Sequence, residues 1–227
     1  MSELLDPNDY IITRKRKKYK FAKFANADNC FEYDEWLAAD KESLLGGREV
    51  IVEIGAGTGL FVVELAERHP ENVYIAIDVK ADRLQKGAYE AIDRKLSNVY
   101  FVRARADQIT ELFPDHAVSA LWLTFSDPFP RKSSAGRRMT HPNFLAKYEQ
   151  VLAPRGKLHI KHDNDAFFAW TLEQLVAGGW RITELSFDLH ESTLPDDYKI
   201  QTTYEQRWLE DDRITKFASS LPPNHST

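Results

Sequence analysis

Residues 50–59 read V-I-V-E-I-G-A-G-T-G, a short apolar run that ends at three glycines on alternate positions. A run of this kind is typical of a strand buried on both faces, as in a parallel sheet. Gly55, Gly57 and Gly59 allow positive φ and a close approach of the backbone to a ligand. Apolar residues then recur at helical spacing as far as Pro70, and the free N–H groups of such a helix favour an anion. The stretch predicts a strand, a ligand-binding turn and a helix.

The spacing of the glycines distinguishes two kinds of nucleotide-binding turn. Dinucleotide-dependent dehydrogenases use G-x-G-x-x-G, whereas this chain has E-x-G-x-G-x-G, with Glu53 just before the first glycine. The second pattern resembles the first motif of the class I S-adenosylmethionine methyltransferases. That resemblance implies S-adenosyl-L-methionine as cofactor, bound in part by Glu53, Gly55, Gly57 and Gly59. A glycine-rich turn without a ligand is the simpler alternative.

The composition is that of one folded domain. The chain has 227 residues, of which 43% are hydrophobic and 12% aromatic, enough for one substantial core. Neither a signal peptide nor a run of membrane-spanning length is visible, so we expect a cytoplasmic protein without a membrane partner. Cys30 is the only cysteine, which excludes an internal disulfide and a Cys-x-x-Cys metal or redox motif.

A basic segment lies near the N-terminus, although the net charge of the chain is −5. No acidic residue interrupts its lysines and arginines, which are Arg14, Lys15, Arg16, Lys17, Lys18, Lys20 and Lys23. A cationic arm on an acidic body suggests a polyanionic partner such as RNA, because basic side chains release condensed counterions from phosphates. A solvated tail would have the same composition, so the segment alone does not identify a partner.

Apolar periodicity predicts alternating strands and helices. Strands are expected near residues 50–54, 73–77, 99–102, 120–125, 157–161, 180–187 and 202–209. Helices are expected near residues 31–45, 60–69, 81–95, 142–153 and 164–177. This order predicts an α/β protein with a Rossmann-like, doubly wound, mostly parallel seven-stranded sheet and an antiparallel last strand. We expect the methyltransferase-like domain to span residues 31–217, between a partly flexible arm (1–30) and a flexible tail (218–227).

Carboxylates follow two of the predicted strands. In a doubly wound sheet the ligand lies at the C-terminal ends of the strands, so the residues after each strand are candidates. Asp78 follows the second strand, where a carboxylate can accept both ribose hydroxyls of a nucleoside, in an NAD protein as well as in a methyltransferase. Asp107 follows the third strand, where a carboxylate can accept an adenine amino group. A surface acid is the simpler account of Asp107.

The fourth predicted strand leads into the most specific stretch of the chain. Residues 126–132 read S-D-P-F-P-R-K, and two prolines in three residues make this loop extended and rigid. Asp127 would lie where a methyl group is delivered. Arg131 and Lys132 end this stretch and Arg137 and Arg138 follow, and we expect these cations to contact phosphate.

Three ordered motifs together resemble the tRNA (guanine-N7)-methyltransferases of the bacterial single-subunit type. That family shows E-I-G-x-G-x-G, then D-P-W-P-K-K, then T-K-F-E, which appear here as residues 53–59, 127–132 and 202–205. The resemblance covers roughly residues 45–210. Arg131 and Phe129 replace the usual lysine and tryptophan, and residues 133–136 lack the usual basic character.

The resemblance implies methyl transfer to N7 of a guanosine in the tRNA variable loop, with tRNA as partner and no metal. Asp127 would be the catalytic residue, and it would contact the cofactor together with Glu53, Asp78 and Asp107. The substrate guanosine would be held by Arg131, Asp163, Thr202, Thr203, Tyr204 and Glu205. Both a monomer and a homodimer fit this expectation.

The expected reaction needs positioning more than acid–base chemistry. N7 of guanine has a lone pair and no proton, so it can attack a sulfonium methyl group without a general base. A nearby carboxylate stabilises the cationic purine, and one facing N1–H and the N2 amino group selects guanine over adenine. Asp127, Asp163 and Glu205 are the candidates. A helix N-cap for Asp163 and a surface acid for Glu205 are the simpler accounts.

Other functions stay open at this stage. The Asp127 loop loosely resembles the D-P-P-Y loop of amino-methyltransferases that modify adenine or protein glutamine, although its second consecutive proline is missing. A non-catalytic RNA-binding scaffold could keep the same fold, whereas an NAD reductase fits poorly because the glycine spacing differs. The histidines predict no metal site, since His159 and His162 are expected on opposite faces of one strand.

Overall fold

A computed structural model describes residues 4–7, 15–208 and 213–223 of the chain. Its strands are β1 (Cys30–Glu32), β2 (Val50–Ile54), β3 (Val73–Asp78), β4 (Val99–Arg103), β5 (Val118–Thr124), β6 (Leu152–His162), β7 (Arg181–Ser186) and β8 (Lys216–Leu221). Its α-helices are α1 (Lys15–Ala25), α2 (Tyr33–Ala38), α3 (Lys41–Leu45), α4 (Leu60–Arg68), α5 (Ala81–Asp93), α6 (Ile109–Leu112), α7 (Pro142–Val151), α8 (Asp165–Ala177) and α9 (Thr203–Trp208). Short 3-10 helices are η2 (Ala106–Gln108), η3 (Lys132–Arg137) and η4 (Asp196–Lys199).

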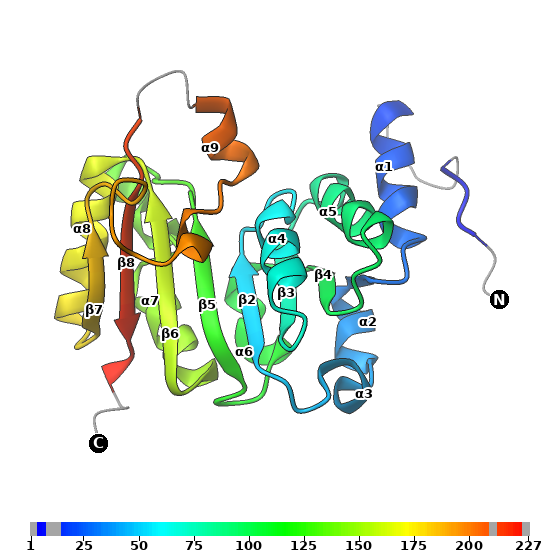
Figure 1. Ribbon diagram of the computed structural model, residues 1–227, viewed down its shortest axis with the longest axis horizontal. Helices are drawn as coiled ribbons and strands as arrows, with labels where there is room; N and C mark the ends of the chain where they lie inside the picture. The colour runs from blue at the N-terminus through cyan, green and yellow to red at the C-terminus, as the bar shows by residue number, and fades with distance from the viewer. Residues whose placement is uncertain (1–3, 8–14, 209–212, 224–227) are drawn as a thin grey trace.

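Within the described residues the strands form one sheet in the order β1-β4-β3-β2-β5-β6-β8-β7. Neighbouring strands are parallel except at β8, which is antiparallel to both β6 and β7. This arrangement confirms the predicted fold class, and it adds β1, a strand that the sequence did not predict, at one edge. The parallel strands all point the same way, and α9 lies near their C-terminal ends (Figure 1).

Two apolar layers cover the faces of the sheet. One face packs against α4 and α5, with side chains of α1 and of the segment before α9 completing the layer. The other face packs against α2, α6, α7 and α8. Strands β2 and β3 are buried along almost their whole length, which explains why they read as near-continuous apolar runs.

The strand predicted near residues 202–209 is wrong, because Thr203–Trp208 form helix α9. The cause is a capping box, a helix-start signal that the pattern T-T-Y-E contains. The Glu205 N–H donates to Thr202 Oγ1 (3.1 Å), and the Thr202 N–H donates to Glu205 Oε2 (2.7 Å). The antiparallel strand at the end of the chain is instead β8, from Lys216 to Leu221.

Both ends of the predicted domain differ from expectation in local structure. The predicted flexible tail begins inside β8, where Ala218, Ser219 and Ser220 are buried in the sheet, so at least that part of the expectation is wrong. In the predicted arm, α1 packs against α5 and buries Ala22 and Phe24. Part of the predicted basic segment, including Arg14, lies outside the described residues. The boundaries at residues 30 and 217 stay predictions of domain organisation.

The single helix expected near residues 31–45 is divided into β1, α2 and α3. Asp40 starts the last of these, because its carboxylate accepts the Ser43 N–H (3.3 Å). None of the helices in the described part of the chain combines the length and the apolar character needed to span a membrane.

Candidate functional site

Two adjoining cavities open at the C-terminal ends of the parallel strands. The smaller has a volume of about 640 Å³ and is lined by the glycine turn after β2, α5 and the start of α9. The larger, of about 1320 Å³, is lined by the loops after β3, β4, β5 and β6. Gly55, Arg83, Phe125 and Tyr204 line both, so the two form one continuous site.

The glycine turn contributes its backbone to this site. At Gly57 φ is +59°, a conformation that glycine adopts without strain. A side chain there would point into open space, so its absence leaves room for a ligand beside the backbone. The Gly57 N–H donates to Asp78 Oδ2 (2.9 Å), and Asp78 Oδ1 accepts the Lys80 N–H (2.8 Å). Each carboxylate oxygen keeps a second acceptor position for a ligand. Gly59 instead lies against Phe101 and lines neither cavity, so its close packing is what excludes a side chain.

Glu53 is buried at the floor of the smaller cavity, with 1% of its surface exposed. Its Oε1 accepts the Thr124 hydroxyl (2.6 Å), while Oε2 has no hydrogen-bond partner among the described residues. Burial raises the pKa of Glu53 to about 8, against the opposing effects of the Thr124 hydrogen bond and the charge of Lys161. A carboxylate that lines a cavity and has one buried oxygen without a partner among the described residues fits a cationic ligand group.

Asp127 lies exposed on the wall of the larger cavity, in a loop with unusual backbone geometry. Its Oδ1 accepts the Phe129 N–H (3.1 Å), and φ is positive at both Phe125 (+51°) and Phe129 (+38°). Non-glycine residues seldom adopt positive φ, and such conformations concentrate at functional sites. The loop therefore presents a carboxylate to the cavity through a strained backbone.

Arg138, which the sequence predicts to contact phosphate, uses part of its guanidinium to hold this loop from behind. Its guanidinium donates to the carbonyls of Pro128 (3.0 Å) and Phe129 (3.1 Å). The same group lies over the Trp170 ring at 4.3 Å, half-buried between α8 and the loop. Arg137 does line the larger cavity, whereas Arg131 is exposed and lines neither cavity.

Asp107 lies where the sequence predicted, in the lining of the larger cavity. Both of its oxygens, however, accept from Arg105: Nη2 to Oδ2 at 2.6 Å and Nε to Oδ1 at 2.9 Å. The pair is partly exposed, so solvent weakens it and a ligand can compete for the carboxylate.

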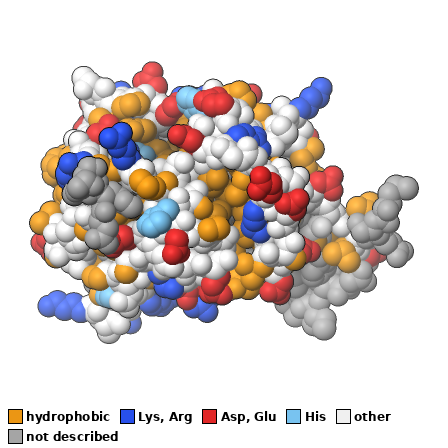
Figure 2. All heavy atoms as spheres, turned by 90° about the horizontal axis from the view of Figure 1, so that it is seen from below, with side chains coloured by type: hydrophobic (Ala, Val, Ile, Leu, Met, Phe, Trp, Pro, Cys, Tyr) orange, Lys and Arg blue, Asp and Glu red, His pale blue; other side chains and the backbone are white. Residues whose placement is uncertain are grey.

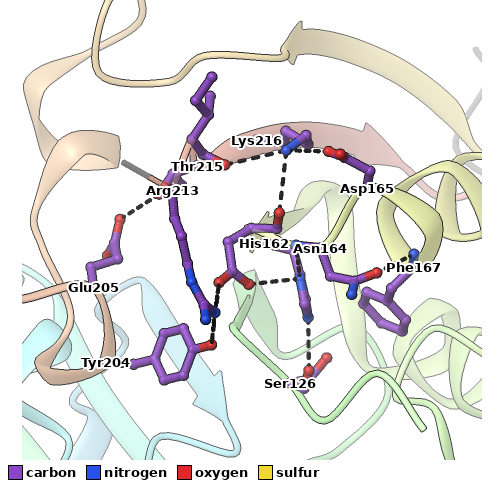
Figure 3. A network of polar contacts seen from close by, with 12 residues as sticks. Ser126, His162, Asn164, Asp165, Phe167, Tyr204, Glu205, Arg213, Thr215 and Lys216 are labelled. Carbon is purple, nitrogen blue, oxygen red and sulfur yellow. Dashed lines mark hydrogen bonds and ion pairs between the residues drawn. The ribbon is translucent and has the colours of Figure 1, made fainter. Parts of the chain in front are cut away.

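Asp163 is held by a polar cluster that we call the Asp163 clasp, formed with His162, Tyr204 and Arg213. Arg213 Nη1 lies 3.0 Å from Asp163 Oδ2 and donates also to the Tyr204 hydroxyl (3.1 Å), which in turn donates to Oδ2 (3.2 Å). Figure 3 shows Tyr204 and Arg213 pointing toward one another beside His162. Burial would raise the pKa of Asp163, but the hydrogen bond from the charged Arg213 guanidinium outweighs it and holds that pKa well below its usual range. The carboxylate is therefore ionised.

The simpler account of Asp163 as a helix cap is excluded, because Asn164 caps α8 by accepting the Phe167 N–H (2.8 Å). His162 fixes the geometry on the other side. Its Nδ1 accepts the Asn164 N–H (2.9 Å), which leaves Nε2–H to donate to the Ser126 carbonyl (2.9 Å). This neutral tautomer ties the end of β6 to the residue before Asp127.

Helix α9 lines the site with its first residues, Thr203 and Tyr204. Thr203 Oγ1 is hydrogen-bonded to Thr58 Oγ1 in the glycine turn (2.9 Å), and the Tyr204 ring lies 5.1 Å from that of Phe125. Glu205, which the sequence placed at the guanosine, is instead buried, with 6% exposed. Its carboxylate contacts Lys161 Nζ (3.0 Å), Thr215 Oγ1 (3.1 Å) and His190 Nε2 (3.2 Å).

The structure thus brings together most of the predicted residues and adds others that sequence reasoning missed. Lys161 is fully buried and joins α9 to β6, and a lysine inside the apolar strand L-H-I-K-H was the available signal. Arg213 follows the last motif and carries no pattern of its own. The described residues contain no cluster of three or more His, Cys, Asp or Glu side chains that could hold a metal.

Comparison with known proteins agrees with this geometry. A family model described as "Putative methyltransferase" matches residues 47–218. A tRNA (guanine-N(7)-)-methyltransferase of Brevibacillus brevis is 40% identical over 168 residues, covering 74% of this chain and 78% of the relative. A protein of the same name from Geobacillus kaustophilus is 34% identical over 209 residues, covering 88% and 95%.

Solved structures support the fold alone. The crystal structure of the 16S rRNA methyltransferase KamB has a TM-score of 0.62 and 18% identity, covering 80% of this chain and 92% of that one. The sheet order with its antiparallel β8, the glycine turn after β2 and the sequence relatives point to one assignment. The chain belongs to the tRNA (guanine-N7)-methyltransferase family of class I methyltransferases.

Proposed function

We propose that the protein transfers a methyl group from S-adenosyl-L-methionine to N7 of a guanosine in the variable loop of tRNA. The observation that carries the proposal is that one continuous site contains two carboxylates in different environments, one buried and one exposed. Glu53 lines the smaller cavity and has one buried carboxylate oxygen without a partner among the described residues, which suits a cation. Asp127 is exposed to the larger cavity, where an acceptor base could lie.

The cofactor would lie along the glycine turn, held by residues whose chemistry matches its parts. Glu53 suits its ammonium group, and the Asp78 carboxylate suits the ribose hydroxyls. Asp107 suits the adenine amino group, which would bind the carboxylate alongside Arg105. When bound, S-adenosylmethionine supplies an electrophilic methyl carbon on a sulfonium sulfur. Gly55 and Gly57 would contact the cofactor through their backbone, whereas Gly59, predicted in the same role, would support the turn through its packing on Phe101.

The protein's own residues would position the base and stabilise the charge that forms on it. In that reaction the lone pair of N7 would form the new bond to the methyl carbon while the carbon–sulfur bond breaks, with its electron pair left on sulfur. Asp127 would stabilise the resulting cationic purine. Asp163 would accept N1–H and the N2 amino group, and Tyr204, with the Thr202 to Glu205 segment behind it, would contact the ring. Arg131, exposed beside this loop, would contact a flanking phosphate.

Mapping the product tests the proposal directly. Unmodified tRNA is incubated with cofactor labelled on the methyl group and then treated with chemistry that cleaves RNA selectively at N7-methylguanine. We expect incorporated label and cleavage at a single position, the guanosine of the variable loop. A transcript with the variable-loop guanosine replaced by adenosine is the matched control and should take up no label. Label on an adenine amino group would favour the amino-methyltransferase alternative, and absence of cofactor binding in calorimetry would favour a scaffold. A cytoplasmic location, where tRNA occurs, belongs to the same proposal.

The pH dependence of cofactor binding gives a second expectation. Because the pKa of Glu53 is raised to about 8, the free protein carries a proton there at neutral pH, and a cationic ligand requires its release. The affinity for S-adenosylmethionine should therefore rise up to about tenfold per pH unit between about pH 6 and pH 8, then level off. Calorimetry in two buffers of different protonation enthalpy should detect the released proton.

The matched control is Glu53→Gln, which keeps an acceptor for the Thr124 hydroxyl but cannot titrate. It should bind the cofactor weakly and without the proton release of the native protein. The sign for stability is opposite to that for binding, since folding raises this pKa above that of the unfolded chain. The free energy of unfolding of the free protein should fall as pH rises from about 5 to about 8. A native affinity that is flat in pH would contradict this role of Glu53.

A further inference from the structure

Basic side chains from three separate elements line the smaller cavity. Lys20 comes from α1, Arg83 and Lys86 from α5, and Arg207 from α9. We call these four residues the cationic wall. Glu53 and the glycine turn, which suit the positive end of the cofactor, line the same cavity.

Within the described part of the chain, the cationic wall has no acidic partner. None of its four members forms an ion pair with a described carboxylate, and Asp82, the acidic neighbour in the same lining, pairs with none of them. In contrast, Arg94 at the far end of α5 contacts three glutamates within 3 Å. In a chain with more acidic than basic residues, four unpaired cations around one opening suggest an anionic partner.

The elements that carry the wall are fixed to the core. The α1 helix packs on α5 through buried Phe24 and through Lys23, whose ammonium lies 4.9 Å from the Tyr89 ring. Helix α9 is fixed by the hydrogen bond between Thr203 and Thr58 and by the buried pair of Glu205 and Lys161. The wall is therefore held in place relative to the cavities.

The position of the wall connects it to the acceptor cavity. Arg83 lines both cavities, as does Tyr204, which precedes Arg207 by one turn of α9. Figure 1 shows parts of α1, α5 and α9 on the side of the molecule where the parallel strands end. On the opposite end of the molecule, acidic, basic and apolar side chains are interspersed (Figure 2).

We propose that the cationic wall binds the phosphate backbone of the RNA strand on one side of the target guanosine. The inference rests on the proposed function, since it names where that substrate would be held. A single cofactor carboxylate needs one cation, whereas four cations spread over three elements suit a chain of phosphates. Exposed Lys and Arg contacts to phosphate set the register of a nucleic acid without reading its bases.

The test is the salt dependence of tRNA binding by the full chain. The variant with Lys86→Ala and Arg207→Ala removes two exposed members of the wall, and Arg181→Ala, at the start of β7 on the opposite end, is the matched control. We expect the double variant to raise KM for tRNA on the order of tenfold and to reduce the slope of log affinity against log salt by about one per cation. The control should keep the native slope, and kcat should change far less than KM.

Calorimetry with S-adenosylmethionine separates the two anions that could occupy the wall. Unchanged cofactor affinity in the double variant, together with the reduced salt slope, supports the proposal. Cofactor affinity that falls while the salt slope stays native assigns the wall to the cofactor carboxylate and overturns it, as does a native salt slope with native cofactor affinity. If the native protein makes no N7-methylguanine, the proposed function fails instead, whatever the slopes.

Discussion

Replacing Asp127 by alanine is expected to lower kcat by at least about 10³-fold while the protein stays folded. Asp127 is exposed at the larger cavity, and among the described contacts its carboxylate accepts only the Phe129 N–H, so its removal leaves no buried group unpartnered. A preorganised charge near the reacting centre contributes about 10²–10³-fold in comparable sites, and loss of the loop contact adds to it. The measurement is single-turnover methyl transfer to tRNA, with the melting temperature recorded in parallel.

Asp127→Asn divides this effect into its two parts. The amide oxygen still accepts the Phe129 N–H and keeps the loop geometry, but the negative charge is lost. If the charge is what matters, the asparagine variant should be almost as slow as the alanine variant. Activity of Asp127→Ala close to that of the native protein would remove Asp127 from the catalytic assignment.

Replacing Lys161 by methionine is expected to cause the largest loss of stability. Lys161 is fully buried, and its ammonium contacts the Glu205 carboxylate at 3.0 Å and the Ile200 carbonyl at 2.7 Å. Burial lowers the pKa of Lys161, and the charge of Glu205 opposes that shift. Removing one partner of a buried pair costs about 3–5 kcal/mol, because the other charge stays buried without compensation. We expect a melting temperature lower by roughly 10 °C for a chain of this length.

The double variant with Lys161→Met and Glu205→Gln is the control. The amide oxygen of glutamine can still accept the Thr202 N–H, so the capping box of α9 survives while no lone charge is buried. The double variant should recover a large part of the lost stability, and the coupling energy measures the pair. A single lysine variant as stable as the native protein would show that the ion pair contributes nothing.

The sequence predicted the central part of the fold because that part is specified locally. The run before Gly55 and the helix that follows need no distant residue to be recognised, and the strands beside them show the same burial on both faces. Residues 202–209 were misassigned because alternation and a capping box coexist in T-T-Y-E, and the hydrogen bonds of Thr202 with Glu205 decide in favour of a helix. Strand β1 depends on its pairing with β4, which three residues alone do not reveal.

The predicted site was less complete than the predicted fold. Motif spacing placed Glu53, Asp78 and Asp127 in the lining of the cavities because each lies within three residues of the C-terminal end of a strand. It could not show that Glu205 faces Lys161, or that Arg138 turns inward onto Trp170, because both depend on contacts between distant segments. The simpler account of Asp163 was ruled out only by the adjacent residue, Asn164, acting as the cap.

The Asp163 clasp has a thermodynamic consequence for substrate choice. Arg213 and Tyr204 already contact Oδ2 of Asp163, whose side chain is only 8% exposed, so in the role proposed for Asp163 a guanine base would first displace them. The apparent affinity of any ligand falls in proportion to the fraction of molecules that are open. A free nucleoside offers little binding energy to offset that opening, whereas a folded RNA that also engages outlying cations offers far more. The contacts that Arg213 and Tyr204 make with Asp163 would then favour tRNA over free nucleosides as substrate.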